Sequence, residues 1–584
     1  MTSIASKLSQ HVGEAFEKEG LSKDLGIVRI SDRPDLAQFQ CNGAMSAAKQ
    51  AKKNPREVAQ NIVNTLSTND VFSNIEIAGP GFINLNVTDK FIEEHLQNLK
   101  NFGVSPTTED KNIILDYGGP NIAKPMHVGH LRAAIIGDAL RRIMSFVGYE
   151  TLGDVHMGDW GTHMGMLIGD YLREGDQDIV LNTDLNDPQA VQRLMDDFAV
   201  RYPKASGEAK ENPDLMREAQ ETTVKLQNKE EPYYGIWQKI RQISVEGMKT
   251  TYAKLGVHFD LWKGEADVHD YIAPMVEKMK DQGLAVEDDG ALIVNVEEEN
   301  DNKKIPPMIL YKRDGAVMYG TTDCATIVER EKLYHPARMI YIVDQRQSLH
   351  FEQVFRAVRK AGIVNDSVEL THAGFGTMNG TDGKPFKTRA GGVMRLEDLI
   401  QMAVEKAQTR LSEARLAEDM EVSERDDVAH KVAIAAIKFA DLQNQRQADY
   451  VFDLDRLTSF EGKTGPYLLY QVVRIKSLLR KAQEKGFKIS KDGFQIYDED
   501  RGLALLLCEF PDVLDLSIRS YAPHYLCEYI FKLAQAFSSF YGNCHILSEE
   551  NEDLRGSRLL LCQKTAQQLE QILILLGINV PERM

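Results

Sequence analysis

The sequence predicts an α/β protein of three parts, in which a small α+β domain and an all-α helical bundle flank a domain with a parallel sheet. Three observations predict these parts. The first hundred or so residues mix helical segments with a short alternating strand. A strand, a glycine-proline loop and a helix then follow one another, as at the opening of a parallel α/β sheet. Beyond about residue 395, the spacing of apolar residues is nearly everywhere that of a helix. We expect the three parts to span residues 1–105, 106–408 and 409–584.

The first part combines helix and strand signals. Residues 49–67, KQAKKNPREVAQNIVNTLS, are predicted to form a helix. The turn-rich AGPG precedes FINLNV, in which Phe82, Asn84 and Asn86 share one face of an expected strand. The stretch KNFGVSPTTEDK has Gly, Pro and charge without periodicity, which indicates a linker near residue 105.

The second part opens with the strand NIILDY, the loop GGPNIAKP and a helix that begins at HVGHLRAA and ends at Gly148. Strand-like runs return at ALIVNV, MIYIV and VELTHAG. Residues at about 172–260 are charged and helical in pattern without a sharp motif. We therefore expect them to form an insertion in the α/β domain.

Composition narrows the class of protein. The 584 residues include 69 Lys+Arg and 87 Asp+Glu, a net charge of −18, and 43% are hydrophobic. These values argue against disorder and against a membrane protein, and the first residues lack the features of a signal or transit peptide. A cytoplasmic location with no membrane partner is therefore expected. The acidic balance argues against a nucleic-acid partner unless basic charge gathers on one face.

The six cysteines show no CxxC pair and no Cys/His grouping with zinc spacing. Neither a disulfide framework nor a metal held by the protein is therefore expected.

The sharpest local motif is His127-Val128-Gly129-His130. Imidazoles three residues apart at the start of a helix share one face of its first turn, and Gly129 lets a ligand approach the backbone. The N–H groups at a helix N-terminus favour a triphosphate, and paired imidazoles there can stabilise the charge that develops when pyrophosphate leaves ATP. In isolation, however, such a pair is more often one packed and one solvated histidine.

The setting of this motif favours a ligand site. Asp116 closes the preceding strand and Lys124 stands just before the histidines. In α/β sheets, ligands bind outside the carboxyl ends of the strands. Much later, the cationic loop KPFKTR contains Lys384, Lys387 and Arg389, and such a loop can close on phosphates during transfer. Alone, it would more often be a solvated surface loop.

Together, HVGH and KPFKTR resemble the paired signatures of the class I aminoacyl-tRNA synthetases, usually written HIGH and KMSKS. Over nearly the whole chain, the sequence resembles arginyl-tRNA synthetase. The segments that carry this resemblance are LDYGGPNIAKPMHVGHLRAAIIGD, GDWGTHMG, KPFKTRAGG, EGKTGPYLLYQVVR and LLGINVPERM. The resemblance implies a Rossmann-like catalytic domain, an N-terminal domain that contacts the D-loop of tRNA and a helical anticodon-binding domain. It also implies ATP, used with Mg²⁺, as a substrate, no tightly bound cofactor, L-arginine and tRNA(Arg) as partners, and a monomer.

The resemblance also implies which residues bind arginine. A guanidinium is a planar, permanently charged fork of donors, so its receptor needs a carboxylate and further acceptors. Tyr319 and Asp323 would contact the guanidinium side, with Asp116 adding charge, while Asn121 and Gln347 would hold the α-amino and carboxylate region. Without the family, Tyr319 and Asp323 would be interpreted as structural.

For ATP, the resemblance implies a site formed by His127, Gly129, His130, Lys384 and Lys387, and a catalytic set of Lys124, His127, His130, Lys387 and Arg389. One departure from the class pattern matters, because Thr388 takes the place of the second KMSKS lysine. The resemblance implies that Lys124, just before HVGH, supplies that missing charge instead. We therefore expect Lys124 to contribute more than Lys387.

Two surfaces are candidates for RNA. Tyr467, Tyr470 and Arg474 share one face of a helix, as is typical either of base stacking or of an amphipathic core stripe. The resemblance adds Met584 near the anticodon loop. In the first part, Phe82 and Asn84 would stack on and hydrogen-bond an exposed base.

Three other interpretations remain open at this point. Another class I synthetase, such as the glutamyl or cysteinyl enzyme, would share HVGH without the acidic and tyrosyl receptor. A smaller HxGH nucleotidyltransferase would have no use for a terminal bundle. A catalytically silent RNA-binding or scaffold protein could lose both histidines and Lys124, which are present here.

Overall fold

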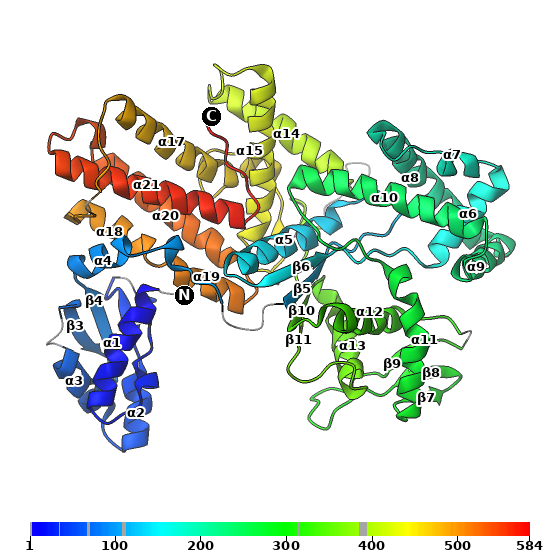
Figure 1. Ribbon diagram of the computed structural model, residues 1–584, viewed down its shortest axis with the longest axis horizontal. Coiled ribbons are helices and arrows are strands. Elements are labelled where there is room, and N and C mark those ends of the chain that lie inside the picture. Colours follow the sequence, from blue (N-terminus) through cyan, green and yellow to red (C-terminus); the bar gives the residue numbers. More distant parts are fainter. Residues whose placement is uncertain are drawn as a thin grey trace. The chain divides into compact units, whose positions relative to one another are not determined.

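The computed structural model describes residues 3–33, 35–66, 70–107, 112–313, 315–384, 394–491 and 493–584. They form two compact units (Figure 1). The first unit comprises Met1–Pro106, Phe460–Ile574 and Asn579–Met584, and the second comprises Thr107–Ser459 and Leu575–Ile578. The second unit contains the parallel sheet.

This parallel sheet is the centre of the second unit. Its strands run in the order β11-β10-β5-β6, with every neighbouring pair parallel. The bounds are β5 (Asn112–Tyr117), β6 (Glu150–Asp154), β10 (Arg338–Ile342) and β11 (Glu369–His372). The inner strands are buried along nearly their whole length, as strands covered by helices on both faces are. The strands expected at NIILDY, MIYIV and VELTHAG are confirmed.

Helices cover both faces of this sheet. In Figure 1, α5 (Leu131–Phe146) lies on one side, and α12 (Tyr319–Tyr334) and α13 (Ser348–Lys360) lie on the other. A buried apolar core joins β10 to α11 (Glu265–Asp281), α12 and α13. The strand expected at ALIVNV is β8 (Ala291–Val294), which pairs in an antiparallel sheet with β7 (Ala285–Asp288) and β9 (Met308–Tyr311).

The remaining elements of the second unit are mostly helical. The expected insertion is helical, as its charged pattern predicts. It contains the end of α6 (Thr162–Glu174), α7 (Gln177–Leu181), α8 (Pro188–Glu211), α9 (Pro213–Gln227) and α10 (Tyr233–Leu255). The other elements are α14 (Leu396–Glu413), α15 (Val422–Leu442), α16 (Leu454–Leu457), and the short parallel pair β12 (Met378–Asn379) and β13 (Tyr450–Val451).

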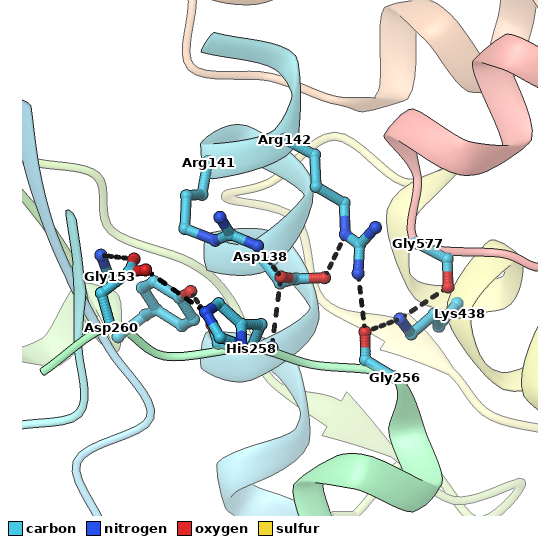
Figure 2. Close-up of polar contacts among 10 residues, drawn as sticks. Asp138, Arg141, Arg142, Gly153, Gly256, His258, Asp260, Lys438 and Gly577 are labelled. Carbon is cyan, nitrogen blue, oxygen red and sulfur yellow. Dashed lines mark hydrogen bonds and ion pairs between the residues drawn. The ribbon is translucent and has the colours of Figure 1, made fainter. Parts of the chain in front are cut away.

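Buried polar contacts fix α5, the helix that follows HVGH. The Arg132 guanidinium pairs with Asp441 of α15 at 3.0 Å, and both side chains are almost fully buried. One turn and a half later, Asp138 accepts hydrogen bonds from Arg141 and Arg142 of the same helix (Figure 2). Because an unpaired buried charge costs several kcal/mol, the Arg132–Asp441 pair fixes α5 against α15 in the second unit.

The same cluster includes the chain segment at Gly577. The buried Lys438 of α15 donates from Nζ to the carbonyl oxygen of Gly577 at 2.8 Å and to that of Gly256 at 3.4 Å (Figure 2). Arg142 also donates to the Gly256 carbonyl, at 3.0 Å. Burial lowers the pKa of Lys438 to about 8. The segment Leu575–Ile578 therefore belongs physically to the second unit.

The first part of the chain forms an antiparallel sheet of strand order β1-β2-β4-β3 with helices. The bounds are α1 (Ile4–Lys18), β1 (Val28–Ile30), β2 (Phe39–Cys41), α2 (Gly43–Ala51), α3 (Pro55–Leu66), β3 (Phe72–Ala78), β4 (Phe82–Val87) and α4 (Asp89–Gln97). The single helix predicted over 49–67 is wrong. The helix breaks at Lys52, which has φ 54°, and restarts at Pro55, because proline cannot continue a helix but fits its first turn.

Five helices form the helical part of the first unit. They are α17 (Gly465–Glu484), α18 (Asp498–Leu507), α19 (Phe510–Arg519), α20 (His524–Asn543) and α21 (Glu552–Leu575). The expected fold class is thus confirmed in the described residues. None of the helices in this part of the chain or elsewhere in the described ranges has the length and apolar character to cross a membrane.

Candidate active site

The HVGH motif forms a tight turn before α5. Val128–His130 is a single 3-10 turn, and α5 starts at Leu131, so the motif precedes the α-helix rather than forming its first turn. The two imidazole rings stack with centroids 4.0 Å apart. His127 Nδ1 accepts a hydrogen bond from the backbone N–H of Gly129, and His130 Nδ1 accepts one from that of His127.

These contacts make both imidazoles neutral donors. A ring nitrogen that accepts an N–H carries no proton, so the proton of each ring lies on Nε2. Burial, followed by the charge of Lys124, lowers the pKa of His127. Burial, followed by the neighbouring His127, lowers the pKa of His130 to about 3. Neutral rings can donate hydrogen bonds to an anion without a proton transfer.

Gly129 permits this stacked arrangement. A Cβ at position 129 would lie 2.8 Å from two atoms of the His127 ring. Gly158 has a similar part in the neighbouring loop, because a Cβ there would lie 2.1 Å from the side-chain oxygen of Asn121. Asn121 is exposed, and its chain segment lies beside Gly158, where the Ile122 N–H donates to the Gly158 carbonyl at 3.0 Å.

Lys124 lies in the loop between β5 and the HVGH turn. Its side chain is half-buried, and its charge contributes to the lowered pKa values of His127, His130 and His163. The ammonium therefore lies close to three imidazoles. This local positive potential favours a polyphosphate.

Asp116 is placed differently from what the sequence suggests. Asp116 and Asp154 are register partners at the ends of β5 and β6, and Arg330 of α12 donates to both carboxylates, at 2.5 and 2.7 Å. Burial raises the pKa of Asp116, and the Arg330 guanidinium opposes that rise. Within the described residues, the partner of Asp116 is therefore the guanidinium of Arg330.

The same place holds a group of possible metal ligands. Within the described ranges, Asp116, Asp154 and His156 have ligand atoms within 4.8 Å of one another. The two carboxylates there already bind the guanidinium of Arg330.

The first turns of α12 carry the expected guanidinium receptor. Tyr319 is its first residue and is 73% exposed. Asp323 lies one turn later and is paired with Nε2 of His350 at 2.5 Å. Gln347, directly before α13, is exposed. The structure thus brings Tyr319, Asp323 and His350 together, and the sequence reasoning missed His350.

Glu265 is a second acid that the sequence reasoning missed. Burial, followed by the carboxylate of Asp159, raises the pKa of Glu265 to about 7, with Asp323 adding to the rise. The pKa of Tyr319 is raised by the protein atoms around its hydroxyl and then by Glu265. Glu265 therefore lies within electrostatic range of Tyr319 and Asp323. Asp159, in the GDWGTHMG segment, accepts a hydrogen bond from the N–H of the neighbouring Ala266 at 2.9 Å. That segment was the signal in the sequence that could have pointed to Glu265.

The cationic loop is only partly described. Lys384 is exposed, and its carbonyl accepts from the Gly380 N–H at 2.7 Å. Lys387 and Arg389 lie outside the described residues.

Of the candidate RNA contacts in the first part of the chain, Phe82 is half-buried on β4. Asn84 is only 6% exposed, and its Oδ1 accepts from Gln40 Nε2 at 2.9 Å. Phe82 therefore remains more accessible than Asn84.

Tyr467, Tyr470 and Arg474 all lie on α17 and are half-buried, as is Met584. Arg474 lies over the ring of Tyr541 at 4.4 Å, and the Tyr467 ring meets that of Phe531 edge-on at 5.8 Å. The face of α17 expected to bind bases thus also packs against α20.

The fold and the HVGH site are those of a class I aminoacyl-tRNA synthetase. Residues 92–454 match the family model described as tRNA synthetases class I (R), catalytic domain. Residues 468–584 match the DALR anticodon binding domain, and residues 2–87 match the arginyl tRNA synthetase N terminal domain.

Relatives of the whole chain narrow the family. The chain is 45% identical over 590 residues to an arginine–tRNA ligase of Alkaliphilus oremlandii and 48% identical over 591 residues to that of Hyphomonas neptunium, each match covering 100% of both chains. It matches the crystal structure of arginyl-tRNA synthetase from Plasmodium falciparum with a TM-score of 0.82 and 27% identity, again over 100% of both chains. The Thermus thermophilus arginyl-tRNA synthetase shares the fold, with a TM-score of 0.80 at 21% identity and the same coverage. The chain belongs to the arginyl-tRNA synthetase family.

We expect Gly129→Ala to reduce the rate of ATP-dependent amino acid activation by about 10-fold or more, because the new Cβ would displace the His127 ring. Steady-state pyrophosphate exchange measures this rate. Gly502→Ala is the matched control, since a Cβ at position 502 has nothing within 4 Å. Full activity of Gly129→Ala would show that the stacked arrangement is dispensable.

Proposed function

We propose that this protein ligates L-arginine to tRNA(Arg) in two ATP-dependent steps. The arginine carboxylate attacks the α-phosphorus of ATP, a carboxyl O–P bond forms, and the bond to the β-phosphate breaks to release pyrophosphate. The 2′-hydroxyl of the terminal adenosine of tRNA then takes the arginyl group from the adenylate, and AMP leaves. No side-chain nucleophile takes part, so catalysis depends on positioning and on charge stabilisation.

For ATP, the proposal assigns the phosphates to the HVGH turn and Lys124. The Nε2–H groups of His127 and His130 donate to the oxygens on which charge develops, and Lys124 adds a full positive charge beside them. Gly129 lets the nucleotide approach the backbone. Lys384, Lys387 and Arg389 are assigned to the loop that covers the phosphates; of these, Lys384 alone belongs to the described residues.

For arginine, the proposal assigns the guanidinium to Glu265, Tyr319 and Asp323. Two carboxylates and a phenol match the fork of donors that a guanidinium presents. Asp116 contributes charge through its cluster with Arg330 rather than as a free carboxylate. Asn121 and Gln347, both exposed, are assigned to the α-amino and carboxylate groups.

Mg²⁺ is proposed to arrive on the phosphates of ATP, where it would neutralise charge on the departing pyrophosphate. This ion usually takes one or two carboxylates together with substrate phosphates. The group of Asp116, Asp154 and His156 in the described part of the chain binds Arg330 instead.

For tRNA, the proposal follows the three-part division of the chain. Residues 1–105 would contact the D-loop through Phe82 and Asn84, residues 106–408 would hold the reacting groups, and residues 409–584 would bind the anticodon through Tyr467, Tyr470, Arg474 and Met584. We propose a cytoplasmic monomer, in which activation requires bound tRNA. The half-buried ring of Phe82, which is more accessible than Asn84, supports base stacking in the first part of the chain.

The observation that carries the proposal is the acidic receptor of Glu265, Tyr319 and Asp323 in the unit that holds the HVGH turn. The test is ATP–pyrophosphate exchange with each of the twenty amino acids, with and without total tRNA. Exchange with arginine alone, dependent on tRNA, is the expected result. Exchange with another amino acid would contradict the receptor, and no exchange under any condition would contradict the activity.

Lys124→Ala should lower arginine-dependent exchange by about 10²-fold or more, the usual cost of one lost transition-state contact. Lys204→Ala, at a half-exposed lysine of α8, is the control for removing a positive charge. If Lys124→Ala exchanges at the wild-type rate, Lys124 has no part in activation.

The KM for arginine should rise as the pH falls below about 7. Glu265 has a pKa raised to about 7, so below that pH it is increasingly protonated and loses its attraction for a guanidinium. Glu265→Gln should raise the KM at high pH and remove this part of the pH dependence, whereas Glu246→Gln, on the surface of α10, should do neither. A KM profile that Glu265→Gln leaves unchanged would exclude Glu265 from the receptor.

Phe82→Ala should raise the KM for tRNA in aminoacylation by about 10-fold, the scale of one lost base stack. The KM values for arginine and ATP should stay at wild-type levels. Phe72→Ala, at a half-buried phenylalanine on the neighbouring strand, is the matched control. An unchanged KM for tRNA in Phe82→Ala would count against stacking.

A further inference from the structure

Tyr202 holds the ammonium group of Lys124 from the inserted helix α8. The Nζ atom of Lys124 lies 4.2 Å from the centroid of the Tyr202 ring. At that distance the negative face of an aromatic ring attracts a cation. Tyr202 is half-buried, so its ring occupies a defined place beside the lysine rather than sampling solvent.

The backbone that carries Lys124 is held by the insertion as well. Ala123 is fully buried and has φ 57°, the left-handed region that costs a residue with a Cβ. Its N–H donates to the hydroxyl of Ser244 on α10 at 3.0 Å, and that hydroxyl donates to the Ile240 carbonyl at 2.7 Å. Strain of this kind persists only where the surroundings fix it. Helices α8 and α10 therefore hold the backbone before Lys124 and the end of its side chain.

The choice of partner preserves the charge of the lysine. Among the described residues, Lys124 forms no ion pair. A carboxylate at the place of Tyr202 would neutralise the ammonium and compete with phosphate for it, whereas an aromatic face attracts the cation and leaves its charge uncompensated.

The neighbours of Lys124 belong to both proposed substrate sites, that of ATP and that of arginine. His127, His130 and His163 all have pKa values that its charge helps to lower. On the other side, the phenol of Tyr202 is close enough to Tyr319 to contribute to the raised pKa of that residue. Tyr202 thus contacts Lys124 directly and lies within electrostatic range of Tyr319.

We propose that Tyr202 is a positioning residue that orients the Lys124 ammonium toward the phosphates of ATP without neutralising it. This inference rests on the proposed role of Lys124 in activation. It assigns to the insertion a part in the chemistry of ATP: the insertion supplies the surface against which the catalytic lysine is held.

A double-mutant cycle tests the inference by arginine-dependent pyrophosphate exchange in the presence of tRNA. Tyr202→Leu, which removes the ring, should lower kcat/KM for ATP by about 10-fold. Tyr202→Phe keeps the ring and should stay within about 2-fold of wild type. In the Lys124→Ala background, Tyr202→Leu should have no further effect beyond about 2-fold, because the group it positions is already gone.

Tyr233→Leu is the matched control. It removes another Lys–Tyr contact within the insertion, in which Lys225 Nζ lies 5.0 Å from the ring centroid of Tyr233. The kcat/KM for ATP of this variant should equal that of the wild type. Phenylalanines with increasing fluorination at position 202 keep the shape of the ring while weakening its negative face, so kcat/KM should fall stepwise along that series even if Tyr202→Leu does not fold.

The outcomes separate this inference from the role of Lys124. If Lys124→Ala is fully active, the proposed role of the lysine fails. If Lys124→Ala is impaired but Tyr202→Leu is harmless, or equally harmful in both backgrounds, Lys124 keeps its role and Tyr202 does not position it. If Tyr202→Phe is as impaired as Tyr202→Leu, or fluorination has no effect, the hydroxyl rather than the ring is what matters and the inference is wrong.

Discussion

One buried guanidinium bridges two carboxylates that the parallel sheet places side by side. Asp116 and Asp154 end neighbouring strands in register, and Arg330, only 1% exposed, bridges them. Removing one member of such a cluster typically costs about 3–5 kcal/mol, so the ion pairs fix the last turns of α12 against the sheet. The first two turns of that helix carry Tyr319 and Asp323. The position of the receptor therefore depends on an interaction at the other end of the helix.

In the site, the groups that attract anions lie apart from the groups whose negative charge would oppose them. Two imidazoles are neutral donors because burial disfavours their charged forms. Among the described residues, Lys124 adds a full positive charge beside them, and its ammonium lies against an aromatic ring. Acids gather instead around Glu265 and Asp323. In the proposed function, such separation of donors from acids would let one site hold a cationic and an anionic substrate at the same time.

The sequence predicted the strands that end at the site, because local spacing encodes them. It placed HVGH in the first turn of a helix, whereas the structure forms a 3-10 turn there and starts α5 at Leu131. It did not predict Glu265 or Arg330. Their acidic partners lie more than fifty residues away along the chain, and neither residue is part of a local motif. The error at residues 49–67 had a local signal, since Pro55 marks a helix start. Asn84 was assigned from its strand face, and its hydrogen-bond partner Gln40 could not be seen without the pairing of β2 with β4.

The segment Leu575–Ile578 affects the order in which the protein can be assembled during translation. Domains generally fold as their residues leave the ribosome, yet the unit that contains β5 and the HVGH turn also needs Gly577, whose carbonyl accepts from Lys438. All of residues 460–574, which belong to the first unit, must be synthesised before that acceptor exists. Until then Lys438 lacks this acceptor. The unit that holds the candidate active site is thus complete only after nearly all of the other unit has been made.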